Sequence, residues 1–253
     1  MAEWVTHLWV ADEVLKQLPE LDRHGFCIGN IAPDCNLFNE DGTDFVPSRQ
    51  VTHWMSGRRK TADDCTEFYK KYVLARQAEI KTSEELSFLL GYYAHLITDA
   101  ELQRYMRDPA RVANAWKRIK EVPELAKKTV GLAEDWDTVK KLFPKEDRMK
   151  DFYCMEREYL DEHPDSGWYT EIKGLEYFPD YIDYLPKQSI SKKIQMMFYD
   201  PLGENSAYPF LGFSREEYNR FVESSVRMVV EAIREAAKTM MPKEILLFES
   251  PTA

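Results

Sequence analysis

The stretch LLGYYAHLITD, residues 89–99, places one histidine and one aspartate inside an otherwise apolar run. Its apolar character predicts a buried helix, and residues four apart on a helix lie on the same face. His95 and Asp99 should therefore point the same way, into the core. A buried carboxylate is costly unless its charge is compensated, and imidazole with carboxylate is a normal ligand pair for zinc. The stretch therefore predicts part of a metal site on a central helix.

Helical patterning extends through most of the chain, and no long alternating strand pattern interrupts it. Thr61, either Thr82 or Ser83, and Ser214 are typical N-terminal caps of three of the predicted helices. The segment 25–50 is rich in Gly, Pro, Asn and Asp, which favours a long structured loop. The aromatic-rich segment 167–186 favours a packing role over a groove. The predicted helices cover residues 4–18, 61–81, 82–107, 109–120, 145–162, 186–199 and 214–240.

The chain reads as an all-α, multi-helix protein. No linker or repeat is visible, so we expect residues 1–253 to form a single domain. The metal-site motifs fall within residues 1–105, and we expect the helices of 106–253 to complete the core and a substrate groove.

Bulk composition excludes several classes of function. The net charge of −10 argues against nucleic acid or an anionic membrane surface as the default partner. No signal peptide or membrane-spanning segment is visible, so we expect a cytoplasmic protein without stable membrane insertion. The four cysteines are scattered without a CxxC pair, which predicts reduced thiols rather than a thiolate zinc site. The oligomeric state stays open.

Three further residues are candidates to join His95 and Asp99. His7 lies on the first predicted helix, and His53 follows the long loop. Asp34 comes directly after Pro33, where the fixed backbone keeps the carboxylate out of a helix. A catalytic zinc needs three or four N or O ligands and an open position for water. The loop-borne Asp34 and His53 could close such a site around the helical pair.

Several of these segments, in this order, resemble the zinc-dependent phospholipase C family over roughly the first 105 residues. The resemblance implies an all-α fold and hydrolysis of a phosphoester by metal-activated water. It implies that Asp34, His53, His95 and Asp99 bind one Zn²⁺, that His7 binds a possible second ion with Asp99 bridging, and that Asp34 also acts as general base. The matching segments are Thr6-His7 with ADEVL at 11–15, GNIAPD at 29–34, Thr52-His53 and LGYYAHLITD at 90–99.

Two departures from the family pattern bear on the number of ions. Secreted members of the family use the amino group of an N-terminal tryptophan as a ligand, whereas Trp4 is internal here. They also carry a histidine six residues after the aspartate, where this chain has Tyr105. We therefore expect one tightly held Zn²⁺, at most one weak second ion, and weak or no turnover of intact phospholipids.

The leading hypothesis is thus a metal-dependent hydrolase of a small-molecule or lipid phosphoester, either a phosphodiester or a phosphomonoester. One alternative is a metal-stabilised binding or scaffold domain that kept the ligands and lost the chemistry. The other is an HD-type phosphohydrolase, which needs an adjacent His-Asp pair that this sequence lacks.

Overall fold

The computed structural model describes residues 3–57, 59–196 and 207–240. Within these ranges the regular secondary structure is helical apart from a two-stranded ribbon, which confirms the predicted all-α class. No helix of the described residues is long and apolar enough to cross a bilayer. The α-helices are α1 (Trp4–Gln17), α2 (Arg23–Gly29), α3 (Arg49–Thr52), α4 (Ala62–Phe68), α5 (Ser83–Tyr105), α6 (Pro109–Glu121), α7 (Pro123–Lys128), α8 (Trp136–Leu142), α9 (Lys145–Glu162), α10 (Ser189–Met196) and α11 (Arg215–Thr239).

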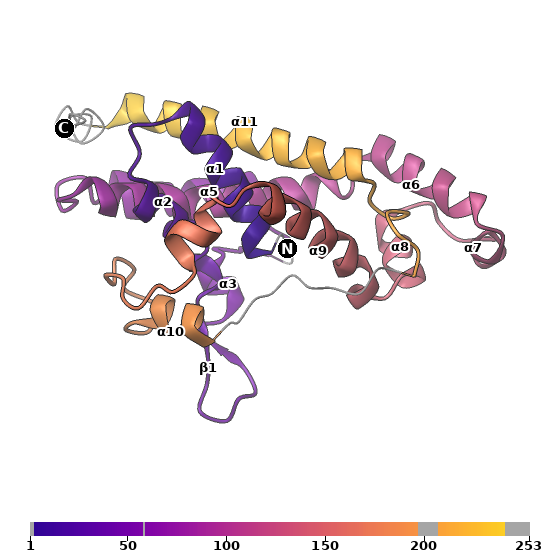
Figure 1. Cartoon of the computed structure of the whole chain (residues 1–253), viewed down its shortest axis with the longest axis horizontal. Coiled ribbons are helices and arrows are strands. Elements are labelled where there is room, and N and C mark those ends of the chain that lie inside the picture. The colour runs from indigo at the N-terminus through magenta and orange to yellow at the C-terminus, as the bar shows by residue number, and fades with distance from the viewer. Residues whose placement is uncertain (1–2, 58, 197–206, 241–253) are drawn as a thin grey trace.

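Shorter turns and one ribbon complete the list of elements. The 3-10 turn η1 covers Ala32–Asp34, and the π-helical turns η2 and η3 cover Tyr69–Leu74 and Trp168–Ile172. Strands β1 (Leu37–Phe38) and β2 (Phe45–Val46) pair antiparallel in a ribbon that projects from the body of the molecule (Figure 1).

Helix α5 is the centre of the structure. Its residues from Leu86 to Asp99 are all buried, as expected for a helix that is apolar on most of its faces. It packs against α1, α2, α4 and α11, and α11 runs beside it along the length of the molecule (Figure 1). Thr82 caps its N-terminus by accepting a hydrogen bond from the backbone N–H of Glu85, as predicted.

The prediction of a long loop over residues 25–50 is wrong at its start, where α2 forms. Gly25 and Gly29 were read as loop residues, but they let α2 approach α5 closely. A Cβ atom at Gly29 would lie 2.1 Å from the carbonyl oxygen of Phe88, and one at Gly91 would lie 2.3 Å from that of Phe26. The glycines therefore serve helix packing, and this contact places α2 against the first half of α5.

Other helix boundaries differ less from the prediction. The predicted helix 61–81 is divided into α4 and the π-helical turn η2, which ends at Leu74. The predicted helix 186–199 begins at Ser189, and its residues 197–199 lie outside the described ranges. The short helices α7 and α8 were not predicted.

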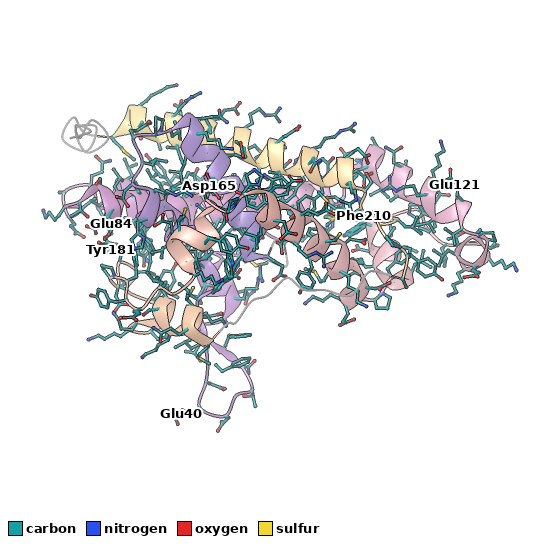
Figure 2. All side chains as sticks on the ribbon, viewed as in Figure 1. Glu40, Glu84, Glu121, Asp165, Tyr181 and Phe210 are labelled. Atoms are coloured by element: carbon teal, nitrogen blue, oxygen red, sulfur yellow. The ribbon has the colours of Figure 1, made fainter. Side chains whose placement is uncertain are left out.

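The aromatic-rich segment mainly packs, as predicted. Trp168 and Phe178 are buried, and the phenol of Tyr181 donates a hydrogen bond to Glu84 (2.7 Å), beside which it lies in Figure 2. Tyr177 is an exception, with 64% of its surface exposed.

A second, smaller hydrophobic cluster lies beyond the end of α5. It contains Trp116 of α6 and Trp136 of α8. The buried Arg111 of α6 joins it to α11 through an ion pair with Glu217 (3.4 Å). Ser214 forms the predicted capping box of α11 with the same Glu217.

Candidate metal centre

The five histidine and aspartate residues singled out in the sequence come together in the buried centre of the molecule. Two groups of three have ligand atoms within 4.8 Å of one another, and His95 belongs to both. One group joins His95 to Asp34 and His53, and the other joins it to His7 and Asp99. The side chains come from α1 (His7), η1 (Asp34), the residue after α3 (His53) and α5 (His95 and Asp99).

His95 is held in one tautomer by α2. Its Nδ1 lies 2.7 Å from the backbone oxygen of Asn30, which only accepts, so Nδ1 carries the proton. The lone pair of Nε2 therefore points away, toward Nε2 of His53 at 3.3 Å. A backbone carbonyl behind a ring nitrogen is the usual partner that orients a histidine ligand of a metal.

His53 is oriented in the same manner. Its Nδ1 lies 2.9 Å from the hydroxyl of Thr52, and that hydroxyl donates to the carbonyl of Arg49. The hydroxyl oxygen is then free to accept from Nδ1, which leaves the lone pair on Nε2. The Nε2 atom lies 3.2 Å from Asp34 Oδ1 and 3.7 Å from Asp99 Oδ2. The two imidazoles and the Asp34 carboxylate thus lie close enough together to share a cation, and Asp99 lies beside His53.

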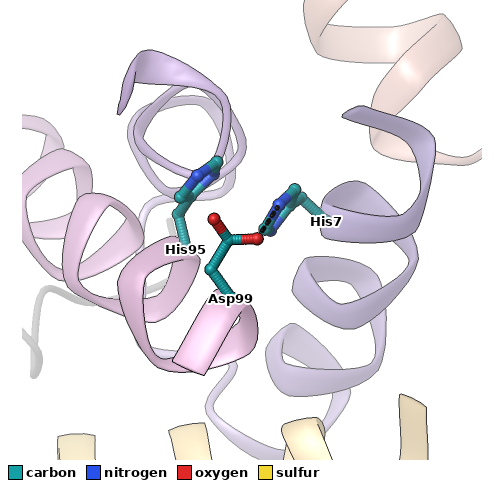
Figure 3. A group of neighbouring side chains, drawn as sticks. All are labelled: His7, His95 and Asp99. Carbon is teal, nitrogen blue, oxygen red and sulfur yellow. Dashed lines mark ion pairs between the residues drawn. The ribbon is translucent and has the colours of Figure 1, made fainter. Parts of the chain in front are cut away.

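His7 and Asp99 supply the clearest test of whether a cation fits. Nε2 of His7 lies 3.8 Å from Asp99 Oδ1, the pair joined by the dashed line in Figure 3. Both residues are buried, and among the described residues neither ring nitrogen of His7 nor this oxygen has a hydrogen-bond partner. Orphaned buried polar atoms are costly, and a divalent ion bound by one His7 nitrogen and by Asp99 Oδ1 would satisfy two of these three atoms. The donor set, two or more imidazoles with carboxylates, fits zinc.

The position of His7 bears on how many ions fit. Its ring stacks on that of His95, with centroids 3.8 Å apart and planes 10° apart. Imidazole lone pairs lie in the ring plane, so the lone pairs of these two stacked rings lie in separate, nearly parallel planes. His7 therefore does not aim at the point on which His95 and His53 converge.

The pKa shifts favour the charge states that metal ligands need. Burial lowers the pKa of His7 to about 4 and that of His95 well below its usual value. Burial alone would raise the pKa of Asp34 and Asp99, but the neighbouring histidines hold both well below their usual range. At neutral pH the imidazoles of His7 and His95 are neutral and the carboxylates of Asp34 and Asp99 are ionised, which is the state that binds a metal ion.

Arg49 is a member of this centre that the sequence reasoning missed. Its Nη2 lies 3.0 Å from Asp99 Oδ2, and its side chain is 34% exposed. Arg49 and His53 are four residues apart, so α3 presents a cation and an imidazole on one face. That spacing was visible in the sequence, but the segment had been assigned to a loop. Arg49 connects the buried centre with solvent.

The two positions that depart from the family pattern belong to the core. Trp4 is the buried first residue of α1. Tyr105, at the end of α5, packs edge-on against Phe213 and near Phe221.

Fold and site together define an all-α protein with a buried histidine and aspartate cluster of the metal-binding type. Residues 6–100, which include every member of this cluster, match the model of the family described as zinc dependent phospholipase C. This match covers less than half of the chain, and it agrees with the family resemblance that the motifs had indicated. Comparison with curated proteins and with solved structures gave no match.

Proposed function

We propose that the protein is a metal-dependent phosphoester hydrolase whose ion is held by Asp34, His53, His95 and Asp99. The observation that carries the proposal is the pair of imidazole Nε2 atoms 3.3 Å apart, each with its other nitrogen occupied. A zinc ion bound there supplies a Lewis acid for the phosphoryl group and lowers the pKa of a coordinated water.

Residues of the chain account for the other steps. Asp34 is the more accessible carboxylate, with 15% of its side chain exposed against 6% for Asp99, and it serves as the proton acceptor for the attacking water. Arg49 reaches the same centre from the solvent side and stabilises negative charge on the phosphoryl oxygens. His7 orients Asp99 from the opposite side, or binds a weak second ion with it.

A turnover screen tests this function. Chelator-treated full-length protein is reloaded with zinc or manganese and assayed on 4-nitrophenyl phosphate, bis(4-nitrophenyl) phosphate and phosphatidylcholine vesicles. We expect metal-dependent turnover of a soluble phosphoester that His95→Ala lowers about 100-fold or more, because a central ligand is lost. His163→Ala is the matched control, since His163 bonds to the carbonyl oxygen of Tyr159 and belongs to neither group of candidate ligands.

Two results would contradict the proposal. Turnover that survives both chelation and His95→Ala would place the chemistry elsewhere. Tight zinc binding with no turnover of any substrate would favour the alternative, a metal-stabilised binding domain.

A further inference from the structure

A basic pocket lies at the C-terminal end of α5, next to the metal centre. It has a volume of about 220 Å³ and is bounded by α5, α8, α9 and the turn before α11. Trp136 and Phe152 are among its apolar walls. Its charged lining consists of four cations and, among the described lining residues, one carboxylate: Arg107, Lys140, Lys145, Arg148 and Asp151. Such an excess of positive charge is unexpected in a chain with a net charge of −10.

The pocket continues the face of α5 that carries the metal centre. Leu102 and Gln103 line it, and they follow Asp99 by three and four residues. Residues at these spacings are neighbours on one helix face, about 5–6 Å apart. The lining of the pocket therefore begins one helical turn beyond Asp99.

Glu3, at the N-terminal end of the first helix, lies near both the metal centre and the basic pocket. The pKa of the Glu3 carboxyl group is raised by burial and by nearby Asp34, and Lys145 lowers it. Glu3 thus lies within electrostatic reach of a ligand of the metal centre and of a cation of the pocket.

The cations of the pocket are only partly neutralised by protein groups. Arg107 and Lys140 share one half-exposed carboxylate, Asp137, at 3.8 and 2.5 Å, and Arg59 contacts the same carboxylate at 3.5 Å. Arg148 donates to the backbone carbonyls of Lys140 and Phe143. Nε of Arg107 is buried without a partner among the described residues. Guanidinium and ammonium donors therefore remain for an anionic ligand.

A further cation, Lys60, lies within electrostatic reach of Asp99 and Arg49 of the metal centre. Lys60 follows Arg59 directly and is only 6% exposed, and its ammonium group has no hydrogen-bond partner in the described part of the chain. Burial lowers its pKa to about 8, with Cys65 and Asp99 opposing that shift and Arg49 contributing to it. A buried cation without a partner is costly, so an anion that reaches this region gains from Lys60 as well as from Arg49.

We propose that the basic pocket binds a second anionic group of the substrate, a phosphate or a carboxylate, while the scissile phosphoester lies at the metal centre. This inference rests on the proposed hydrolase function. The substrate class is then a phosphoester with an additional negative charge, either a soluble metabolite or a lipid headgroup. A quaternary ammonium headgroup is disfavoured by the four cations. The volume is below the 300–1,000 Å³ typical of sites for drug-sized ligands, so the pocket suits a small anionic group and not an acyl chain.

Binding of inorganic pyrophosphate to chelator-treated full-length protein tests the pocket without any turnover. The variant Arg107→Gln/Lys140→Gln removes two lining cations. The control Lys127→Gln/Lys128→Gln removes two exposed cations of α7 and changes the net charge equally. In calorimetric titrations we expect the pocket variant to bind about tenfold more weakly, because charged hydrogen bonds are lost, and the control to bind like the wild type. Absence of binding to the wild type, or equal weakening in both variants, overturns the proposal.

Kinetics of the metal-loaded protein separate this proposal from the proposed function. For a phosphoester with a second anionic group, the pocket variant should raise KM about tenfold and leave kcat unchanged, whereas KM for 4-nitrophenyl phosphate should not change. If the pocket variant and the control variant turn over this phosphoester with the same KM, the pocket proposal is wrong and the hydrolase proposal stands. If no substrate is turned over but pyrophosphate binding is lost only in the pocket variant, the hydrolase proposal is wrong. The pocket is then supported as an anion-binding site.

Vesicles distinguish the two sources of the anion. Phosphatidylcholine vesicles with and without phosphatidylinositol 4-phosphate are sedimented with wild type and with Arg107→Gln/Lys140→Gln. Cosedimentation that needs the phosphorylated lipid and is lost in the pocket variant supports a lipid headgroup. Pyrophosphate binding without cosedimentation supports a soluble substrate.

Discussion

At the scale of single residues, helical spacing was the most reliable guide to the site. The four-residue spacing of His95 and Asp99 predicted a shared buried face, and the structure brings both to the cluster. The residues that orient this cluster were not predictable in the same way. Asn30 acts through its backbone oxygen, so its side-chain chemistry carried no signal. Arg49 meets Asp99 from a different segment, and a contact fifty residues apart in sequence depends on the fold.

Asp151, in the basic pocket, should make stability depend on pH. Burial, with nearby Asp147, raises the pKa of its carboxyl group to about 6, against about 3.9 in an unfolded chain. Between about pH 4 and 6 the folded state binds more protons than the unfolded state, so stability falls as pH rises. The Asp151→Asn variant lacks this loss. Its free energy of unfolding, measured relative to that of the wild type, should therefore rise by up to about 3 kcal/mol from pH 4 to pH 7.

Urea unfolding at these two pH values measures the difference. Asp161→Asn, at an exposed carboxylate of the same helix, is the control, and its difference from wild type should stay constant. An Asp151→Asn variant whose difference from wild type is the same at pH 4 and pH 7 would show that the carboxyl group is not perturbed.

At the scale of elements, capping residues predicted helix starts well, because a cap is a local interaction between neighbours in sequence. Thr61, Thr82 and Ser214 all cap the helices that they were expected to cap. Helix α2 was missed because glycine at a helix crossing and glycine in a loop look alike in one sequence. What distinguishes them is the approach of α5, which only the tertiary structure shows.

Gly29→Ala should separate α2 from α5. The added Cβ would lie 2.1 Å from the Phe88 carbonyl oxygen, so one backbone must move. We expect a loss of about 3 kcal/mol in the free energy of unfolding. Zinc affinity should fall too, because the Asn30 carbonyl that holds His95 moves with α2. Gly57→Ala is the control, since no described atom lies within 4 Å of a Cβ there. Equal stability and zinc affinity in both variants would refute this account of the helix crossing.

At the scale of the whole molecule, the all-α class followed from helical periodicity and the absence of long strand patterns. Periodicity alone could not predict the site, because its residues come from four segments spread over residues 7–99. Their convergence was inferred from ligand chemistry and from the resemblance to a family, and not from periodicity. Expectations of one folding domain over residues 1–253 and of a cytoplasmic location stay predictions.

A metal that links these segments should stabilise the fold. Binding to the native state alone adds about 2.7 kcal/mol when the free ion is at 100 times its dissociation constant. For a chain of this size that corresponds to roughly 5–10 °C in Tm. Chelator should therefore lower the Tm of the zinc-loaded wild type by about this amount and leave that of His95→Ala unchanged. Equal melting of zinc-loaded wild type with and without chelator would contradict a structural role of the ion.

Titration of the metal-free protein with zinc tests the existence of the metal centre most directly. We predict one tight equivalent that is lost in His95→Ala and retained in His163→Ala, with at most one weak equivalent that depends on His7. Three tight equivalents accompanied by phospholipid hydrolysis would show that the ligand shells are more complete than described above. No tight zinc binding, or tight binding that survives His95→Ala, would contradict a metal centre built on His95 and Asp99.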